Sequence, residues 1–528
     1  MATEPASAPL PPVLRPENPP ARELSELAER FGLDVRGDAD GVSARGITLA
    51  TADLRAGEVF VGIHGARRHG AEFAEQAAAQ GAVAILTDAA GAEIAAPSGL
   101  PILIAEDPRA VLGFVSAWLY GTDHDVPTLF AVTGTNGKTS TAHVLEGILN
   151  QLGVVTGLSS TAERHIAGAS IVSRLTTPES SEMHALLALM RERGVEAVAV
   201  EVSAQALSRH RVDGIRFDVA GFTNLTHDHL DDYGDLATYL EAKLALFRPD
   251  RAQRGVVCID TASGLEVLRR SEIPVVTVAA PQLAEDPDAA ANADWRVRID
   301  DETQRKTTFT VTAPDGAAVT TRIPVIGAHM AANTALAIAM LVEGGYPFEQ
   351  IAAALKRDGQ VDAALPGRTE LVSGPTGPAV YVDFSHTPDS FEKTLAAVRK
   401  VTPGRVLMMF GASGNRDTLK RPIMGRVAAK GADIVIVTDH HPRYEDPAPI
   451  RAALLAGARS AGTDAEIHEI AAPEDAIHTA VGLVGDGDAI LWAGPGHQDY
   501  REIDGARTPF SARALARQAL SDAGWPVP

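Results

Sequence analysis

The residue pattern with the clearest chemistry is a short glycine-containing segment, Gly134-Thr135-Asn136-Gly137-Lys138-Thr139-Ser140. It follows an apolar run, Leu129 to Val132, that is typical of a buried strand, and precedes apolar residues at helical spacing from Ala142 to Leu152. In such a strand–turn–helix unit, glycines let backbone N–H groups approach phosphate oxygens, and the helix N-terminus favours negative charge. Lys138 could reach the β- and γ-phosphates of a nucleotide, and the Thr139 hydroxyl could hold Mg²⁺. The segment therefore predicts an ATP-binding loop, in a shortened form of the common P-loop.

Two further apolar runs of the central region also end in polar clusters. The run Ala197 to Val200 leads into Glu201, and the run Asp218 to Phe222 leads into a polar stretch that contains His229. In open parallel sheets, ligands bind beyond the carboxyl ends of the strands, so these clusters should meet the phosphate loop at one sheet edge. Glu201 and His229 are then candidate metal ligands beside the threonine of that loop.

The last part of the chain repeats this pattern. Four strand-like runs each lead into a polar cluster, and the clusters begin at Asp383, Gly411, Thr438 and Gly494. Strands and helices alternate cleanly there, which predicts a second parallel sheet whose carboxyl edge is a second binding surface. A phosphate loop, candidate Mg²⁺ ligands and a second binding sheet together indicate an ATP-dependent transferase or ligase.

These elements predict an α/β protein of three domains, which its 528 residues can accommodate. Residues 21–123 are expected to form an N-terminal domain. Residues 124–365 are expected to form a central ATP-binding domain with a P-loop parallel sheet, including irregular or antiparallel β structure at 281–322. Residues 366–528 are expected to form a C-terminal domain with a Rossmann-like parallel sheet. Residues 1–20 are rich in Pro, Ala and Glu and predict a disordered tail.

Composition limits the partners and the location of the protein. The formal net charge of −21 argues against binding to nucleic acid or to an anionic membrane. No apolar run is long enough to cross a bilayer, and the N-terminus lacks the pattern of a signal peptide. The single cysteine, Cys258, excludes an internal disulfide and fits a reducing compartment. We therefore expect a cytoplasmic protein without membrane insertion, acting as a monomer.

Several motifs, taken in chain order, resemble the Mur ligase family. They are the loop from Gly134 to Ser140, Glu201-Val202-Ser203, the stretch from Thr223 to Asp231, the run from Gly327 to Asn333, Gly367-Arg368, Asp383 with His386-Thr387-Pro388, and Arg416-Asp417 with Lys420-Arg421-Pro422. The resemblance covers nearly everything after the N-terminal tail. It implies a magnesium-dependent, ADP-forming ligase of peptidoglycan synthesis, and so a role in cell-wall biogenesis, cell shape and cell division.

The resemblance is greatest to the branch that adds the third amino acid of the stem peptide to UDP-N-acetylmuramoyl-L-alanyl-D-glutamate. ATP would phosphorylate the D-glutamyl γ-carboxylate, and the amine of a free amino acid would attack the resulting acyl phosphate. Two negatively charged reactants must approach each other, so neutralising charge is the main catalytic need. In the family, the lysine that matches Lys243 is carbamylated and helps to fix a magnesium ion.

The site residues of the family carry over position by position. The catalytic residues are Lys138, Glu201, His229 and Lys243. The metal ligands are Thr139, Glu201, His229 and Lys243. The ATP-binding residues are Gly134, Thr135, Asn136, Gly137, Lys138, Thr139, Ser140, Asn333, Arg368 and Asp383. The residues for the UDP-linked substrate are Leu49, Thr51, Ala66, Arg67, Arg68, Thr176, Thr177, Ser203, Arg209 and Arg211, with Thr51 in place of a usual serine and Arg209 in place of a common glutamine. The amino-acid-binding residues are Arg416, His440, His441, Arg443, Gly494 and Gln498.

The amino-acid pocket departs from family members that take meso-diaminopimelate. Those enzymes have Asp-Asn-Pro-Arg where this chain has His440-His441-Pro442-Arg443, and a glutamate at the position of Gln498. Both carboxylates that would hold the distal ammonium are missing, and an unpaired buried ammonium costs on the order of 3–5 kcal/mol. We therefore expect L-lysine, another diamino acid such as L-ornithine or L-diaminobutyrate, or homoserine rather than meso-diaminopimelate. Nearby acidic residues could still restore an ammonium site: Asp439, Glu445, Asp446 or Asp499.

Two further departures are Ala204-Gln205, where the family usually has Ser-His, and His227, where arginine is common. We expect altered contacts at these positions and retained activity. Three alternatives stay open: the D-Ala-D-Ala-adding Mur ligase, a folylpolyglutamate synthase, and an ATP-binding regulator that has lost catalysis. The last alternative fits poorly with the presence of the full catalytic set.

Overall fold

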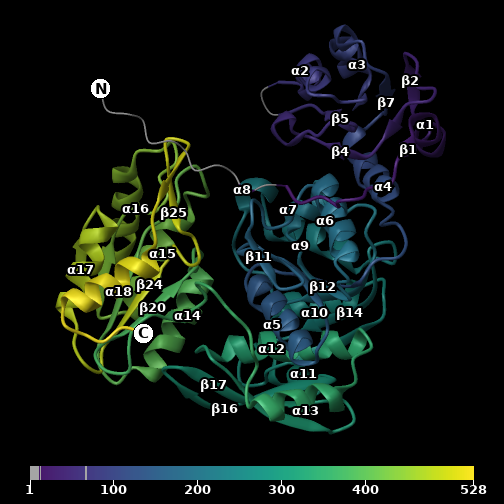
Figure 1. The fold of residues 1–528 in the computed structure, drawn as a ribbon. Coiled ribbons are helices and arrows are strands. Elements are labelled where there is room, and N and C mark those ends of the chain that lie inside the picture. The colour runs from purple at the N-terminus through teal and green to yellow at the C-terminus, as the bar shows by residue number, and fades with distance from the viewer. Residues whose placement is uncertain (1–10, 12, 66–67) are drawn as a thin grey trace.

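The computed structural model describes residues 11, 13–65 and 68–528. In this part the chain forms three α/β lobes in chain order, coloured from purple through teal to yellow in Figure 1. The sheets of the central and C-terminal lobes are largely parallel, which confirms the predicted fold class.

The N-terminal lobe is built on a five-stranded sheet with the order β2-β7-β6-β5-β4. Its strands are β2 (Asp34–Arg36), β4 (Gly46–Thr48), β5 (Glu58–Gly62), β6 (Ala84–Thr87) and β7 (Ile102–Ile104), and β1 (Arg22–Glu23) pairs separately with β3 (Ser43–Ala44). Its helices are α1 (Leu24–Phe31), α2 (Ala74–Ala79), α3 (Ala89–Ala95) and α4 (Pro108–Tyr120). Helix α1 buries Leu24, Leu27 and Ala28 on one face and ends at Gly32, whose φ of 62° is left-handed.

The central lobe contains an eleven-stranded sheet with the order β11-β10-β9-β12-β8-β13-β14-β15-β16-β17-β18. Its strands are β8 (Thr128–Thr133), β9 (Thr156–Ser159), β10 (Glu163–Ile166), β11 (Ala169–Val172), β12 (Ala197–Glu201), β13 (Phe217–Phe222), β14 (Ala252–Cys258), β15 (Val275–Ala279), β16 (Trp295–Thr303), β17 (Lys306–Thr312) and β18 (Ala318–Ile323). Strands β9 and β12 to β16 run parallel with β8, whereas both ends of the sheet are antiparallel. The antiparallel structure expected near 281–322 is therefore part of the same sheet.

Helices cover this central sheet on both faces. They are α5 (Lys138–Gln151), α6 (Ser180–Glu192), α7 (Ala204–Ser208), α8 (Leu230–Tyr233), α9 (Leu236–Leu244), α10 (Ala262–Arg270), α11 (Pro287–Ala291), α12 (Ala328–Glu343) and α13 (Phe348–Asp358). The alanine-rich helix α12 packs against α5 and the sheet in one core. Because both faces are covered, β8 and β12 are almost continuously apolar. Strand β8 lies between β12 and β13, so the ends of these three strands meet at one edge, as predicted.

The C-terminal lobe contains a six-stranded sheet with the order β19-β20-β24-β21-β22-β23. Its strands are β19 (Glu370–Leu371), β20 (Ala379–Asp383), β21 (Val406–Phe410), β22 (Ile434–Val437), β23 (Glu466–Glu469) and β24 (Ala489–Ala493), followed by the hairpin β25 (Tyr500–Ile503) and β26 (Ala506–Pro509). Its helices are α14 (Pro388–Val401), α15 (Lys420–Gly431), α16 (Pro447–Arg459), α17 (Pro473–Leu483) and α18 (Ala512–Asp522). Strands β20 to β24 are parallel, whereas β19 is antiparallel.

The predicted disordered tail is wrong for the residues near 13–19. Val13 is buried, and Arg15 forms an ion pair of 2.6 Å with Glu58 in which both side chains are almost fully buried. The backbone N–H groups of Glu17 and Asn18 donate to the Glu192 carboxylate at 2.7 and 3.0 Å. Composition predicted disorder because it cannot register single anchoring contacts with distant parts of the chain.

The turn between β16 and β17 reaches the C-terminal lobe, as Figure 1 shows at the lower edge of the molecule. Tyr381 donates to the Gln304 carbonyl at 2.9 Å, and Arg305 donates to the Gly374 carbonyl at 2.7 Å. In the described residues, no helix combines the length and apolar character needed to span a membrane.

Candidate active site

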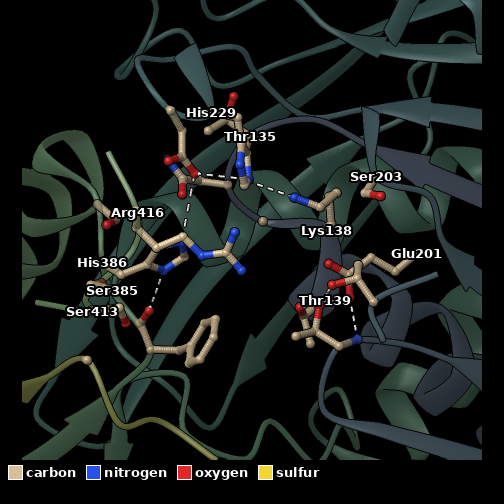
Figure 2. A pocket seen from close by; sticks show the side chains of 18 of the residues that line it. Thr135, Lys138, Thr139, Glu201, Ser203, His229, Ser385, His386, Ser413 and Arg416 are labelled. Carbon is tan, nitrogen blue, oxygen red and sulfur yellow. Dashed lines mark hydrogen bonds and ion pairs between the residues drawn. The ribbon is translucent and has the colours of Figure 1, made fainter. Parts of the chain in front are cut away.

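A cavity of about 550 Å³ lies between the central and C-terminal lobes, at the carboxyl edges of their two sheets. Figure 2 shows Lys138, Thr139 and Glu201 on one side and Ser385, His386 and Arg416 on the other. The structure thus brings together two binding surfaces that the sequence predicted separately.

Most predicted site residues line this cavity. They are Thr135, Asn136, Gly137, Lys138, Thr139, Ser140, Thr176, Glu201, Ser203, Arg209, Arg211, His229, Lys243, Asn333, Arg368, Asp383, Arg416, His440, His441, Arg443, Gly494 and Gln498. The set includes all six residues predicted to bind the amino acid.

The remaining predicted residues do not line the cavity. Gly134 begins the phosphate loop directly after β8. Leu49 follows β4, and Thr51 begins a 3₁₀ turn, Thr51–Asp53, in the N-terminal lobe. Arg68 is exposed, with its guanidinium 4.8 Å from the centre of the Phe73 ring. Thr177 is fully buried, where it donates to the Glu201 carbonyl at 2.8 Å and accepts from the Ser203 N–H at 3.1 Å. Ala66 and Arg67 lie outside the described residues.

The phosphate loop is held in place by residues that follow β13. Asn224 accepts from the Asn136 N–H at 3.0 Å, and Thr223 donates to the Asn136 carbonyl at 2.6 Å. Gly137 has a φ of 89°, and a Cβ atom there would lie 2.7 Å from Asn333 Oδ1. Only glycine meets both conditions without strain. Helix α5 then begins at Lys138, so the loop leads directly into a helix N-terminus.

Two lysines converge on the carbonyl of Gly134. Lys138 donates to it at 3.0 Å and to the Thr135 carbonyl at 2.9 Å, and Lys243 donates to it at 2.8 Å. Burial lowers the pKa of both amines, and the charge of Lys138 lowers that of Lys243 further, so that it falls well below its ordinary value. A buried lysine with a strongly lowered pKa carries a nucleophilic neutral amine.

Of the four predicted metal ligands, the structure brings two into contact. Thr139 donates to Glu201 Oε2 at 3.0 Å, whereas His229 Nδ1 pairs with the Gln205 amide at 3.0 Å and Lys243 contacts Gly134. Among the described residues there is no group of three or more His, Cys, Asp or Glu side chains arranged to hold a metal. Magnesium is commonly held by one or two carboxylates together with substrate phosphates, so a hydroxyl and a carboxylate beside a phosphate loop fit this ion.

Charged contacts join the two lobes around the cavity. Asn136 donates to Asp389 at 2.9 Å, and Lys420 donates to Asp228 at 3.2 Å. Burial alone would raise the pKa of Asp228, but His386 and Lys420 outweigh this effect and hold it well below its usual range. Sequence reasoning assigned no role to Asp228 or Asp389, although Asp228 directly precedes His229 in a motif that it did identify.

The residues predicted to bind the amino acid include a fixed, neutral histidine pair. The Glu502 N–H donates to His441 Nδ1 at 2.9 Å, so His441 Nε2 carries the proton and donates to Gln498 Oε1 at 2.9 Å. The His440 and His441 rings lie 4.0 Å apart between centroids, and burial lowers the pKa of both. Both side chains are therefore uncharged near neutral pH.

Each acidic residue that could have restored an ammonium site already has a partner. Asp439 pairs with Arg451, Glu445 with Arg421 at 2.6 Å, and Asp499 with Arg513 at 2.9 Å. Asp446 accepts from the Ala448 N–H at 3.0 Å at the start of α16.

Comparison with known proteins identifies the family. Three family models match the chain: "Mur ligase family, catalytic domain" over residues 43–115, "Mur ligase middle domain" over 132–341 and "Mur ligase, glutamate ligase domain" over 367–496. A UDP-N-acetylmuramyl-tripeptide synthetase of Leifsonia xyli subsp. xyli is 55% identical over 519 residues, covering 98% of this chain and all of that protein. The chain belongs to the Mur ligase family. It is accordingly an ATP-dependent, ADP-forming ligase of peptidoglycan synthesis.

Other relatives carry a more specific name. A UDP-N-acetylmuramoyl-L-alanyl-D-glutamate--2,6-diaminopimelate ligase of Streptomyces coelicolor is 40% identical, covering 96% of this chain and 98% of that protein. A solved structure of a ligase with the same name has a TM-score of 0.64 at 24% identity, covering 95% of this chain and 99% of its own. A solved structure of MurF from Acinetobacter baumannii has a TM-score of 0.66 at 16% identity, covering 90% of this chain and 96% of its own. At such identities the structural matches establish the fold alone.

Proposed function

We propose that this Mur ligase adds the third amino acid of the stem peptide to UDP-N-acetylmuramoyl-L-alanyl-D-glutamate, using ATP and Mg²⁺. The observation that carries the proposal is the single cavity in which the phosphate loop faces all six predicted amino-acid-binding residues. The name of the 55% identical Leifsonia relative, which aligns along its whole length, supports the same substrate pair. We also place the enzyme in the cytoplasm, because it uses ATP and because its single cysteine fits a reducing compartment.

The reaction that fits the site has two steps. A γ-carboxylate oxygen of the D-glutamyl residue attacks the γ-phosphorus of ATP, and ADP leaves. The amine of the incoming amino acid then attacks the carbonyl carbon of the acyl phosphate, loses a proton, and expels phosphate as the amide forms. Lys138 supplies positive charge to the phosphates, and the backbone N–H groups at the start of α5 orient them. Thr139 and Glu201 would hold Mg²⁺, which neutralises phosphate charge when bound.

Lys243 belongs to this mechanism as a modified residue. A neutral lysine amine attacks CO₂ to give a carbamate and a proton, which replaces the neutral amine by an anion. The burial of Lys243 beside Lys138 favours the neutral amine that this reaction needs. The carbamate would then add an anionic oxygen donor at the phosphate loop.

We propose further that the added amino acid has an uncharged side chain, such as that of homoserine. The predicted amino-acid-binding residues include the neutral pair His440 and His441 with Gln498. Of the four acidic candidates nearby, three form ion pairs and Asp446 caps the start of α16. Arg416 and Arg443 line the same cavity, and each suits the α-carboxylate of a substrate rather than a second ammonium. The rival substrate is meso-diaminopimelate, which the name of the Streptomyces relative favours.

The test of the ligase reaction is ADP release by the purified enzyme with ATP, Mg²⁺ and UDP-N-acetylmuramoyl-L-alanyl-D-glutamate, assayed with and without each of several amino acids. The proposal predicts turnover only when acceptor and amino acid are both present. ADP release that is independent of the acceptor, or absent with every amino acid despite ATP binding, would contradict it. UDP-N-acetylmuramoyl-L-alanine serves as the control acceptor, because it lacks the glutamyl carboxylate.

A further inference from the structure

The turn between β9 and β10 fixes the carboxylate of Glu201 from the side opposite Thr139. Thr161 in this turn donates to Glu201 Oε2 twice, from its backbone N–H at 2.7 Å and from its hydroxyl at 2.9 Å, and the oxygen of that hydroxyl also lies 3.0 Å from the Thr176 hydroxyl. Thr139 donates to the same oxygen at 3.0 Å. Three donors thus converge on Oε2, and no group in the described part of the chain donates to Oε1. Thr161 and Glu201 both line the cavity.

The turn is attached to the phosphate-loop helix by two histidines. His165 on β10 contacts the Glu146 carboxylate of α5 through Nδ1 at 2.7 Å, and the Glu163 carboxylate through Nε2 at 2.8 Å. Because both ring nitrogens face carboxylates, His165 donates from both and is an imidazolium. On the other side of the turn, His143 of α5 contacts Ser160 Oγ at 3.1 Å.

Both attachments are largely shielded from water. The side chain of Glu146 is 8% exposed and that of His165 is 17% exposed. Burial alone would lower the pKa of His165, but its hydrogen bonds to Glu146 and Glu163 outweigh that effect and raise the pKa to about 9. Burial lowers the pKa of His143 to about 4, so this second ring is neutral. The two histidines therefore carry one positive charge, on His165, which lies between the carboxylates of Glu146 and Glu163.

We propose that His165 and Thr161 are positioning residues for Glu201: His165 clamps the β9–β10 turn to α5, and Thr161 then holds Glu201 Oε2 so that Oε1 is presented to the cavity. This inference rests on the proposed function, in which Glu201 holds Mg²⁺. A carboxylate that is fixed at one oxygen loses little rotational freedom when its other oxygen takes a ligand. The helix that carries Lys138 and Thr139 is also the helix that carries Glu146, so the clamp sets Glu201 relative to the phosphate loop.

The test compares Thr161→Val, which keeps the backbone N–H and removes the hydroxyl, with His165→Gln, which removes the charge. Thr310→Val and His468→Gln are the matched controls. Thr310 lies in an exposed hairpin and donates to Asp300, and His468 pairs with Glu466 at 2.8 Å on the edge strand β23. His165→Arg restores a cation between the two carboxylates and serves as the conservative variant.

Two readouts separate positioning from folding. In ADP release with saturating acceptor and amino acid, we expect Thr161→Val and His165→Gln to lower kcat at least tenfold and to raise the Mg²⁺ concentration for half-maximal activity several-fold. The KM for the amino acid should stay within twofold, His165→Arg should recover part of the loss, and both controls should resemble the wild type. In calorimetric titration with ATP, the gain in affinity that Mg²⁺ gives the wild type should shrink in the same two variants.

The inference is overturned if Thr161→Val and His165→Gln keep kcat and the Mg²⁺ requirement within twofold of the controls. It is equally overturned if the two substitutions change the KM for the amino acid and the thermal midpoint as strongly as they change kcat. Such a uniform effect would indicate a merely structural role. A wild-type enzyme that binds ATP without turnover would instead refute the proposed function. The calorimetric comparison would then still decide whether Thr161 and His165 support Mg²⁺-dependent nucleotide binding.

Discussion

At the scale of single residues, the chemistry depends on a few buried charged groups whose partners are fixed. Lys243 is 1% exposed. Its amine donates to the Gly134 carbonyl, lies 4.3 Å from the centre of the Tyr239 ring, and is close enough to Lys138 to feel its charge. No carboxylate accepts a hydrogen bond from it in the described part of the chain. Burial and the charge of Lys138 disfavour an ammonium group here more than the Tyr239 ring and the Asp228 carboxylate favour it, which suits a lysine that is converted to an anion.

Lys243→Met should therefore remove activity while leaving the fold intact. Methionine keeps the apolar stem, so the melting temperature should stay within a few degrees of that of the wild type. The rate of ADP release should fall at least 100-fold. Wild-type enzyme depleted of CO₂ should lose activity and regain it on addition of bicarbonate. Lys356→Met, at an exposed position of α13, is the control. Full activity of Lys243→Met would remove this residue from the mechanism.

A second prediction at the residue scale concerns Gln498 and the choice of amino acid. Gln498→Glu places a carboxylate in the proposed amino-acid pocket, where His441 Nε2 already donates to Gln498 Oε1. An ammonium next to a buried carboxylate gains a charge-assisted hydrogen bond, so the KM for L-lysine should fall at least tenfold. Competition assays that pair L-lysine with L-homoserine measure the shift. An unchanged ratio between the two substrates would show that the side chain binds elsewhere.

At the scale of secondary-structure elements, the site is assembled by strands that are neighbours in the sheet and distant in the chain. The phosphate loop follows β8, Glu201 ends β12, and the cluster that supports the loop follows β13. The adjacent β9–β10 hairpin closes this arrangement by bonding to Glu201 and to α5. Element order in the sheet, rather than chain order, therefore decides which residues share the site.

The clamp between the hairpin and α5 should make stability depend on pH. A histidine whose pKa is raised to about 9 contributes stability that is fully present below its unfolded pKa, about 6.5, and is lost as the pH rises through about 9. Glu146 and His143 face it from α5, and Glu163 faces it from its own strand. The difference in unfolding free energy between wild type and His165→Gln should be about 2 kcal/mol at pH 6 and approach zero near pH 10.

Denaturant unfolding at several pH values measures this difference. His468→Gln serves again as control, because its partner is also a glutamate but its side chain is 30% exposed. A difference for His165→Gln that grows with pH would contradict the assignment of a buried imidazolium.

At the scale of the whole molecule, the cavity exists because the two lobes dock through buried polar contacts. Lys420 from the C-terminal lobe is 11% exposed and Asp228 from the central lobe is 7% exposed in their mutual ion pair. Removing one partner of a buried pair leaves the other charge uncompensated, which costs more than removing both.

Lys420→Met alone should therefore destabilise the docked arrangement by about 2 kcal/mol or more, and the double variant Lys420→Met with Asp228→Asn should be less destabilised than this single variant. Calorimetric unfolding should show the C-terminal lobe melting earlier in the single variant. Equal effects of the single and double variants would mean that the pair contributes nothing to docking.

The sequence predicted the parts of this structure that have local signals. Strand β8, its loop and helix α5 are marked by apolar periodicity and glycines, and the polar clusters at strand ends follow from the parallel-sheet rule. Contacts made between distant segments had no such signal. Asp389 lies 253 residues from its partner Asn136, and Thr161 lies 40 residues from Glu201. The partners of such residues depend on lobe docking and strand order, which a pattern within one segment does not contain.

The measurement that tests the central claim most directly is the identity of the product formed in competition. Wild-type enzyme is given ATP, Mg²⁺, UDP-N-acetylmuramoyl-L-alanyl-D-glutamate and an equimolar mixture of L-homoserine, L-lysine, L-ornithine, L-diaminobutyrate and meso-diaminopimelate, and the UDP-linked product is identified by mass spectrometry. The account predicts one principal product, the UDP-linked tripeptide that contains homoserine. A product that contains meso-diaminopimelate would contradict the assignment of the pocket, and the absence of any tripeptide would contradict the proposed ligase reaction itself.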